Sequence, residues 1–168
     1  MKNQFSVPLK EVISLGREEA IRLKSDAIGT GHLLLALIKQ DHNMEAHFLK
    51  KADIALSQLQ KEIEACILQE DKISAAPAGK AMVFKKTIFG RRSSPPPNGL
   101  PLSRNAEKAI RIGLLEAKRM HSSLVEPEHL LLSILNDTDD SAATVFTRHG
   151  ITHQSVEAQI RELSQAHR

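Results

Sequence analysis

The sequence predicts an all-α protein that contains two copies of one helical unit. Aromatic residues make up only 3% of the 168 residues, with no Trp and no Tyr, so Leu, Ile, Ala, Val and Met must form the core. Such side chains suit close helix packing better than a β-sandwich. Apolar residues also recur at intervals of three and four, as in amphipathic helices, and one stretch of sequence recurs in similar form.

The internal repeat decides the domain organisation. Residues 20–35 align without gaps with residues 117–132, and the same register relates matching residues further out on both sides. A fixed register over this length indicates a duplicated structural unit. We therefore predict two repeats, residues 1–68 and 102–168, separated by a linker at residues 69–101.

Each repeat is expected to begin with a helix capped by a serine, Ser6 in the first copy and Ser103 in the second. Both helices contain a glycine at the same position, Gly16 and Gly113. Glycine inside a helix costs about 1 kcal/mol relative to alanine. Its presence in both copies therefore predicts that another backbone passes close to each helix at this turn.

A second helix is expected to start near Thr30 in the first repeat and near Pro127 in the second, where proline suits the first turn. Each of these helices carries a Leu-Leu-Leu run and is apolar all round, so it belongs at the centre of the repeat. The remaining helices are expected at about residues 44–51 and 56–67, and at 141–148 and 153–166.

The linker at residues 69–101 has a different composition, with a triple proline and several Gly, Ser and Ala residues. Such a composition favours an extended, mobile chain. Residues 81–89 hold two of the five phenylalanines, so this patch is either a short docking segment or part of a tether that packs loosely on its own domain.

The excess positive charge lies in the linker. The formal net charge is +3, yet residues 1–68 carry nine basic and nine acidic residues, and residues 102–168 carry eight and nine. The linker has six basic residues against two acidic ones. A basic linker indicates nucleic-acid binding less strongly than a basic folded face does.

Three motifs resemble a known family. Glu-Glu-Ala-Ile-Arg-Leu at residues 18–23, Ile-Gly-Thr-Gly-His-Leu-Leu-Leu-Ala-Leu at 28–37 and Glu-His-Leu-Leu-Leu-Ser-Ile-Leu at 128–135 are similar to the Clp N-terminal repeat domain of ClpC- and ClpA-type AAA+ unfoldases. The resemblance covers both repeats, and the linker is longer than in most members. It implies an eight-helix, pseudo-twofold module that binds substrates and adaptor proteins and passes them to the ATPase ring.

The resemblance also implies a site at the start of each second helix, where ClpC-type relatives read Gly-Thr-Glu-His and the Glu helps bind phosphoarginine. The second repeat keeps this carboxylate as Glu128, beside His129. Ser103 matches the family's hydroxyl, and Arg104 follows it. Pro127 replaces the Thr and removes one backbone donor. The alternative is that Glu128 is only a first-turn carboxylate favoured by the helix dipole.

The first repeat departs further from the family pattern. Gly31 stands where the Glu would be, although Thr30, His32 and Ser6 remain. The part of the site that would read a guanidinium group is therefore missing, and we expect at most one phosphoarginine site.

Neither catalysis nor a cofactor is expected. The sequence has no Gly-x-x-x-x-Gly-Lys-Ser/Thr loop to bind the phosphates of ATP. His32 and His129 lie on separate helices without the Cys/His spacing of a zinc site. Cys66 has no activating partner in the sequence, and the acidic pairs at 18–19 and 139–140 are typical of solvated surfaces.

The sequence therefore predicts a monomeric, cytoplasmic module that recognises substrates or adaptors for a Clp ATPase, either free-standing or as the front of a longer unfoldase. It lacks a secretory signal and a membrane-spanning apolar run, and its single cysteine can form no internal disulfide. Two alternatives stay open. One is a binder of nucleic acid or an acidic surface through the basic linker, and the other is a decoy that competes for Clp adaptors.

Overall fold

The structure is a computed structural model that describes residues 4–40, 55–75 and 99–166. Within these ranges it contains seven helices and no strand longer than a single paired residue. The helices are α1 (Val7–Arg22), α2 (Thr30–Lys39), α4 (Leu56–Ala75), α5 (Arg104–Arg119), α6 (Pro127–Leu135), α7 (Ser141–Arg148) and α8 (His153–Ala166). The all-α prediction is confirmed. The helix expected at residues 44–51 and the patch at 81–89 lie outside the described residues.

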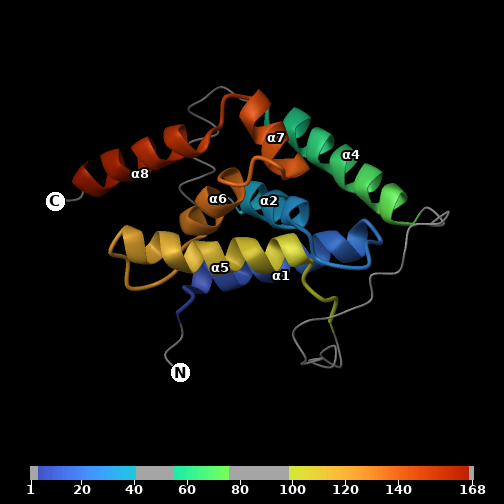
Figure 1. Cartoon of the computed structure of the whole chain (residues 1–168), viewed down its shortest axis with the longest axis horizontal. Coiled ribbons are helices and arrows are strands. Elements are labelled where there is room, and N and C mark those ends of the chain that lie inside the picture. Colours follow the sequence, from blue (N-terminus) through green and yellow to red (C-terminus); the bar gives the residue numbers. More distant parts are fainter. Residues whose placement is uncertain (1–3, 41–54, 76–98, 167–168) are drawn as a thin grey trace.

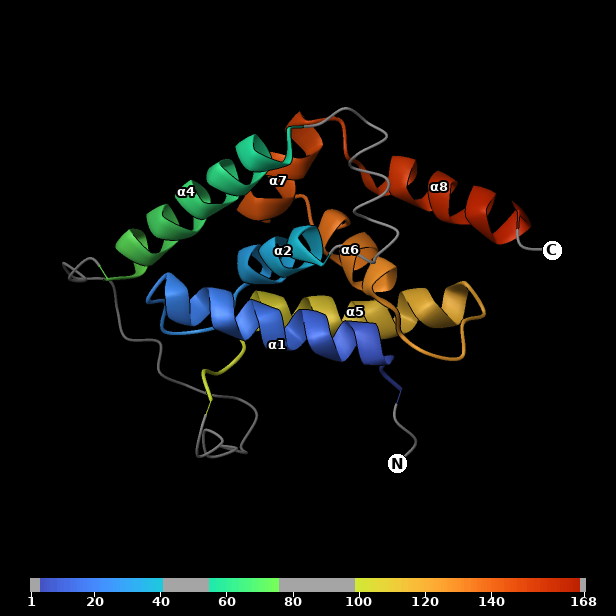
Figure 2. The ribbon, with the colours of Figure 1, turned by 180° about the vertical axis from the view of Figure 1, so that it is seen from behind.

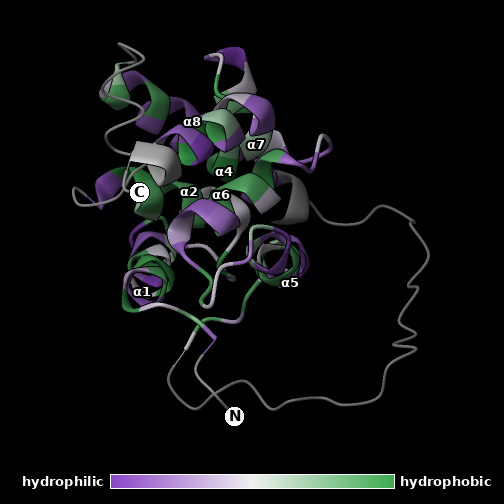
Figure 3. Cartoon of the chain, turned by 90° about the vertical axis from the view of Figure 1, so that its left-hand side faces the viewer, coloured by the Kyte–Doolittle hydropathy of each residue, from purple (hydrophilic) through white to green (hydrophobic). Residues whose placement is uncertain are grey.

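The helices form three layers around a central pair (Figure 1). α2 and α6 lie in the middle, with α1 and α5 on one side and α4, α7 and α8 on the other, as the view from behind also shows (Figure 2). A view along α1 and α5 shows these two helices on either side beneath the central pair (Figure 3). Every residue of α2 from Thr30 to Ile38 is buried, which confirms the predicted central position of this helix.

The repeated glycines lie where α1 crosses α2 and where α5 crosses α6. A Cβ at Gly16 would be 3.5 Å from the carbonyl oxygen of His32 and 3.0 Å from Cδ2 of Leu33. A Cβ at Gly113 would be 3.5 Å from the carbonyl oxygen of His129. The close backbone approach predicted from the two glycines is therefore confirmed at both crossings.

Two short backbone contacts join the repeats and reveal their symmetry. Phe5 pairs with Val125, and Ile28 pairs with Leu102, both in parallel orientation. Their hydrogen bonds have N···O distances of 2.7 to 3.1 Å. The repeat aligns Phe5 with Leu102 and Ile28 with Val125. The second contact is therefore the first contact with the two repeats exchanged. A pseudo-twofold axis produces this relation, so the predicted arrangement is confirmed.

The helix ends repeat in the same register. The hydroxyl of Ser6 accepts from the N–H of Leu9, and the hydroxyl of Ser103 accepts from the N–H of Ala106, both at 3.2 Å. Both predicted N-caps are therefore confirmed. After the first helix of each repeat, one residue adopts a left-handed conformation, Lys24 with φ of 60° and His121 with φ of 56°.

α4 is longer than the sequence analysis predicted. The expected helix ended near Ile67, with the linker beginning at residue 69, whereas α4 continues to Ala75. Residues 68–76 contain no Gly or Pro to end the helix, and Gln, Glu and Lys propagate it well. The hydroxyl of Ser25 also donates to Asp71 at 2.6 Å, which connects this extra length to the α1–α2 loop. Residues 69–75 are thus part of the helical unit.

A histidine caps the first turn of each central helix. Nδ1 of His32 accepts from the N–H of Gly29, and Nδ1 of His129 accepts from the N–H of Glu126, both at 2.9 Å. Burial lowers the pKa of both histidines below the ordinary value, and nearby carboxylates offset this only in part. Both rings are therefore buried as neutral acceptors.

At the glycine crossings, a small and a large side chain are predicted to have opposite effects on the free energy of unfolding. We expect Gly113→Ala to raise the free energy of unfolding by about 0.5–1 kcal/mol, because alanine is the better helix former and its Cβ meets only ordinary contacts. Gly113→Leu should lower it by about 1–3 kcal/mol through overpacking. Urea unfolding followed by circular dichroism measures both.

Gly16 provides the matched comparison. Gly16→Ala should gain less stability than Gly113→Ala, since its Cβ requires Leu33 to move. Equal gains at the two positions would contradict the tighter crossing in the first repeat.

The capping histidines predict a loss of stability in acid. Their pKa is lower in the folded state than the ordinary value of 6.5, so their contribution is complete above pH 6.5 and is lost as the pH falls below it. We expect the free energy of unfolding to fall between pH 7 and 5.5. The double variant His32→Gln/His129→Gln should fall less steeply, because glutamine can accept the same backbone hydrogen bond without titrating.

His121→Gln, at an exposed position, is the control and should keep the pH dependence of the unmodified protein. Urea unfolding at pH 7, 6 and 5.5 gives the comparison. If the free energy of unfolding falls equally with pH in the unmodified protein and the double variant, the capping histidines do not cause the loss of stability in acid.

Candidate functional site

A cleft with a volume of about 550 Å³ lies at the start of α2. Its walls come from the α1–α2 loop, the last turns of α4 and the first turn of α5. Five residues of the predicted site line it: Thr30, Gly31, His32, Ser103 and Arg104. The cleft therefore contains residues of both repeats.

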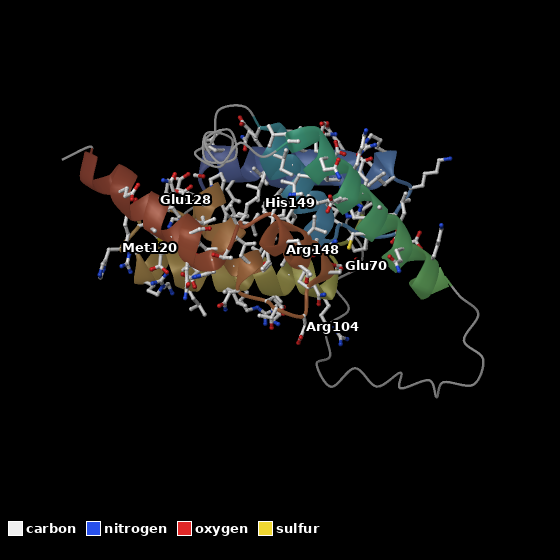
Figure 4. The ribbon with its side chains drawn as sticks, turned by 90° about the horizontal axis from the view of Figure 1, so that it is seen from above. Glu70, Arg104, Met120, Glu128, Arg148 and His149 are labelled. Atoms are coloured by element: carbon white, nitrogen blue, oxygen red, sulfur yellow. The ribbon has the colours of Figure 1, made fainter. Side chains whose placement is uncertain are left out.

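The structure groups the predicted site residues across the repeats. Ser103 belongs with the start of α2, because a Cβ at Gly29 would lie 3.9 Å from its hydroxyl oxygen. Ser6 belongs with the start of α6, because its N–H donates to the carbonyl of Val125 at 3.1 Å. The sequence-based grouping of Ser103 with Glu128 is therefore wrong, because Ser103 lies at the start of α2. Figure 4 shows Glu128 well apart from Arg104 and Glu70.

In the first repeat, Gly31 stands where the resemblance expects a glutamate, and the side chain of Ile67 fills the space beside it. A Cβ at Gly31 would lie 2.7 Å from Cγ1 of Ile67 and 3.0 Å from its Cδ1. These distances are shorter than packed carbon atoms allow, so any side chain here requires Ile67 to move. α4 thus packs directly on the first turn of α2, which explains why glycine fits this position.

Thr30 connects the two repeats through a buried hydrogen bond. Its hydroxyl donates to Oδ2 of Asp140 at 2.7 Å, while Oδ1 of Asp140 accepts from the N–H of Ala143 at 3.0 Å. Asp140 therefore caps α7 and holds the start of α2 at the same time. The position matching Thr30 is Pro127, which has no hydroxyl and cannot make the equivalent bond.

His32, Ser25 and Asp71 form a chain of hydrogen bonds beside the cleft. Nδ1 of His32 accepts a backbone proton, so the neutral ring carries its own proton on Nε2. Nε2 lies 3.1 Å from the hydroxyl of Ser25, which donates to Asp71 at 2.6 Å. In this tautomer His32 cannot remove a proton from Ser25. The arrangement orders the loop and α4 and does not activate a nucleophile.

The cleft also contains charged residues that the sequence motifs do not indicate. Lys24 and Asp26 come from the α1–α2 loop, and Glu70 and Asp71 come from the last turns of α4. The loop carries no recognisable motif, and α4 was expected to end before residue 70. The absence of a helix-breaking residue between 68 and 76 was the available signal for the second pair.

Glu128 at the start of α6 has a distinct electrostatic environment. Burial raises the pKa of its carboxyl group, and the nearby carboxylate of Glu126 adds to the effect. Among the described residues, no basic side chain forms an ion pair with Glu128. A cationic group placed here would therefore lower the cost of ionising this carboxylate.

The expectation that both acidic pairs are solvated is wrong for one member of each pair, because Glu19 and Asp140 are buried and only Glu18 and Asp139 are exposed. Glu19 pairs with Lys39 and Arg22 at 2.6 and 2.7 Å, and Asp140 is the cap of α7. Cys66 is a half-buried free cysteine. Within the described ranges, no group of three His, Cys, Asp or Glu residues could hold a metal ion. Among the described helices, none combines the length and the apolar character that a membrane crossing requires.

Comparison with known proteins identifies relatives of this chain. The "Negative regulator of genetic competence ClpC/MecB" of Bacillus subtilis is 26% identical over 163 residues, which are 97% of this chain and 17% of that protein. The "ATP-dependent Clp protease ATP-binding subunit ClpC" of Staphylococcus saprophyticus is 27% identical over 151 residues, which are 90% of this chain and 16% of that protein. This chain thus spans about a sixth of the length of these relatives.

Solved structures share the fold. The N-terminal domain of ClpD from Arabidopsis thaliana has a TM-score of 0.64 at 19% identity, with 96% of this chain and 95% of that chain covered. The Hsp104 N-terminal domain from Candida albicans has a TM-score of 0.67 at 18% identity, with 96% and 92% covered.

The match to a protein family extends over both repeats. Residues 4–84 and 92–167 match the family described as "Clp repeat (R) N-terminal domain". The resemblance inferred from the sequence motifs is thereby confirmed. This chain belongs to the family of Clp repeat N-terminal domains.

Proposed function

We propose that this chain is a recognition module that binds segments of substrate or adaptor proteins on behalf of a Clp AAA+ unfoldase. The observation that carries the proposal is the match of both repeats to the N-terminal region of ClpC proteins. The cleft at the start of α2 supports it, since residues from three separate elements converge there around an opening of about 550 Å³. The geometry around Ser25 and His32 favours binding over catalysis.

Binding of phosphoarginine is the finer part of the proposal and concerns the second repeat. A half-buried carboxylate at Glu128 suits a guanidinium group, and the positive end of the α6 dipole suits a phosphate. Ser6 lies nearby through its bond to Val125. The first repeat offers no equivalent carboxylate, because Ile67 fills the space beside Gly31. One site is therefore proposed.

The alternative of a nucleic-acid or acidic-surface binder depends on the linker, most of which lies outside the described residues. It stays a prediction, as does the decoy that competes for adaptors. Salt separates an electrostatic complex from an apolar one, since phosphate contacts weaken steeply as ionic strength rises.

The recognition proposal predicts which molecules the protein recovers from its native lysate. We expect Clp subunits or their adaptors to be recovered by the full chain and equally by a variant whose residues 76–98 are replaced by a neutral Gly/Ser segment of equal length. Mass spectrometry and nucleic-acid staining of the eluates, at low and moderate salt, give the readout. Recovery of nucleic acid alone, lost in the variant and at moderate salt, would reverse the ranking of the two functions.

The phosphoarginine proposal predicts saturable binding of the free amino acid at a single site. Glu128→Ala should weaken this binding by about tenfold or more, the value of a charge-assisted hydrogen bond. Isothermal titration calorimetry measures the affinity and the number of sites. Gly31→Glu is the matched variant and should add no second site, because Ile67 occupies that space. Absence of binding, or equal binding by Glu128→Ala, would end the proposal.

A further inference from the structure

The outward face of α5 is strongly basic. Its exposed residues include five basic side chains and one acidic one: Arg104, Lys108, Arg111, Lys118 and Arg119, with Glu107. The repeat as a whole has no positive excess, because it contains nine acidic residues and eight basic ones. The charge is therefore separated by position, with the cations concentrated on one helix.

Three of these cations form a line without an ion pair among the described residues. Lys108 pairs with Asp137 at 2.7 Å, and Arg119 pairs with acidic residues of α5 and α8. Arg104, Arg111 and Lys118 take part in none of the ion pairs of the described chain. They are seven residues apart, so they lie on one side of the helix at steps of roughly 10 Å.

An exposed leucine lies within this line of charge. Leu115 is 61% exposed and lies between Arg111 and Lys118 on the same side of α5. Residues four apart are neighbours on a helix surface, so Leu115 lies next to Arg111. The face thus offers one apolar contact among cations.

The basic face is not a requirement of the fold. α1 occupies the pseudo-symmetric place, and its residues at the positions of the three unpaired cations are Val7, Ser14 and Ile21. All three are exposed as well. The same helix packing is therefore compatible with a neutral outer face, so packing alone does not account for the charge on α5.

We propose that the exposed face of α5 docks an acidic segment of a partner protein, with an apolar side chain of that segment on Leu115. The inference rests on the proposed recognition function and specifies the chemistry of the partner. Charge complementarity calls for an anionic partner. Leu115 favours a protein over nucleic acid, because an exposed apolar side chain suits an apolar side chain of a peptide. Arg104 also lines the cleft at the start of α2. A segment docked on α5 could therefore extend into this cleft.

The test uses the full chain and a fluorescein-labelled peptide of glutamates around two central leucines. The comparison ligands are the same peptide with serines in place of the leucines and a DNA duplex of equal net charge. Fluorescence anisotropy should show tighter binding of the leucine peptide than of either comparison ligand. Arg104→Glu/Arg111→Glu/Lys118→Glu should weaken that binding by about tenfold or more, and Leu115→Ser should remove the preference for leucine over serine.

The pseudo-symmetry supplies a matched control. Val7→Glu/Ser14→Glu/Ile21→Glu introduces three glutamates at the equivalent positions of α1 and should leave peptide affinity within about twofold. Circular dichroism and the unfolding midpoint verify that both triple variants fold. Equal weakening by the two triple variants, equal affinity for the two peptides, or tighter binding of DNA would overturn the proposal. Self-association of the unmodified protein through α5 would also overturn it, by assigning the face to a second copy.

A failure of this test is distinguishable from a failure of the recognition proposal. If the lysate experiment recovers Clp subunits or adaptors while the acidic peptide does not bind α5, recognition stands and the docking surface is wrong. If neither experiment shows binding, both proposals are wrong.

Discussion

The burial of α2 and α6 between the outer layers is the constraint on which the rest of the structure depends. Both helices are short and almost entirely apolar, and every residue of α2 from Thr30 to Ile38 is buried. The backbones of α1 and α5 pass close to this pair at Gly16 and Gly113, and the tighter contact at Gly16 leaves little room for a side chain. Burial of this many apolar side chains is the dominant favourable contribution to folding, and it places the two polar helix starts at the boundary between the repeats.

That placement creates composite sites. The loop before α2 pairs with the segment before α5, and the loop before α6 pairs with the segment before α1. Each second helix therefore begins beside a serine of the other repeat. The starts of α2 and α6 make equivalent backbone contacts but carry different side chains. One has a glycine covered by Ile67 and the other has a half-buried carboxylate, Glu128.

The elements that are local in sequence could be predicted well. Ser6, Ser103 and the two internal glycines act as the residue types suggested. The grouping of Ser103 with Gly31 could not be predicted, because alignment of the repeats tells which residues are equivalent and not which are adjacent. The end of α4 was misplaced although residues 68–76 contain no Gly or Pro. A contact from a distant part of the sequence also holds this end of the helix, since Ser25 donates to Asp71. Charge totals by segment also concealed the basic face of α5, since the acids of the same repeat lie on other elements.

The crossed backbone contacts relate the two repeats as subunits are related in an isologous homodimer. In such a dimer any substitution occurs twice, so a basic helix on one side would entail a basic helix on the other. Fusion of the two copies in one polypeptide removes that restriction. Arg111 and Ser14 occupy equivalent places, yet each can change without the other. Because the two copies are covalently connected, a nearly symmetric fold can carry a basic face on one helix only. Such a face suits a partner that has no symmetry of its own.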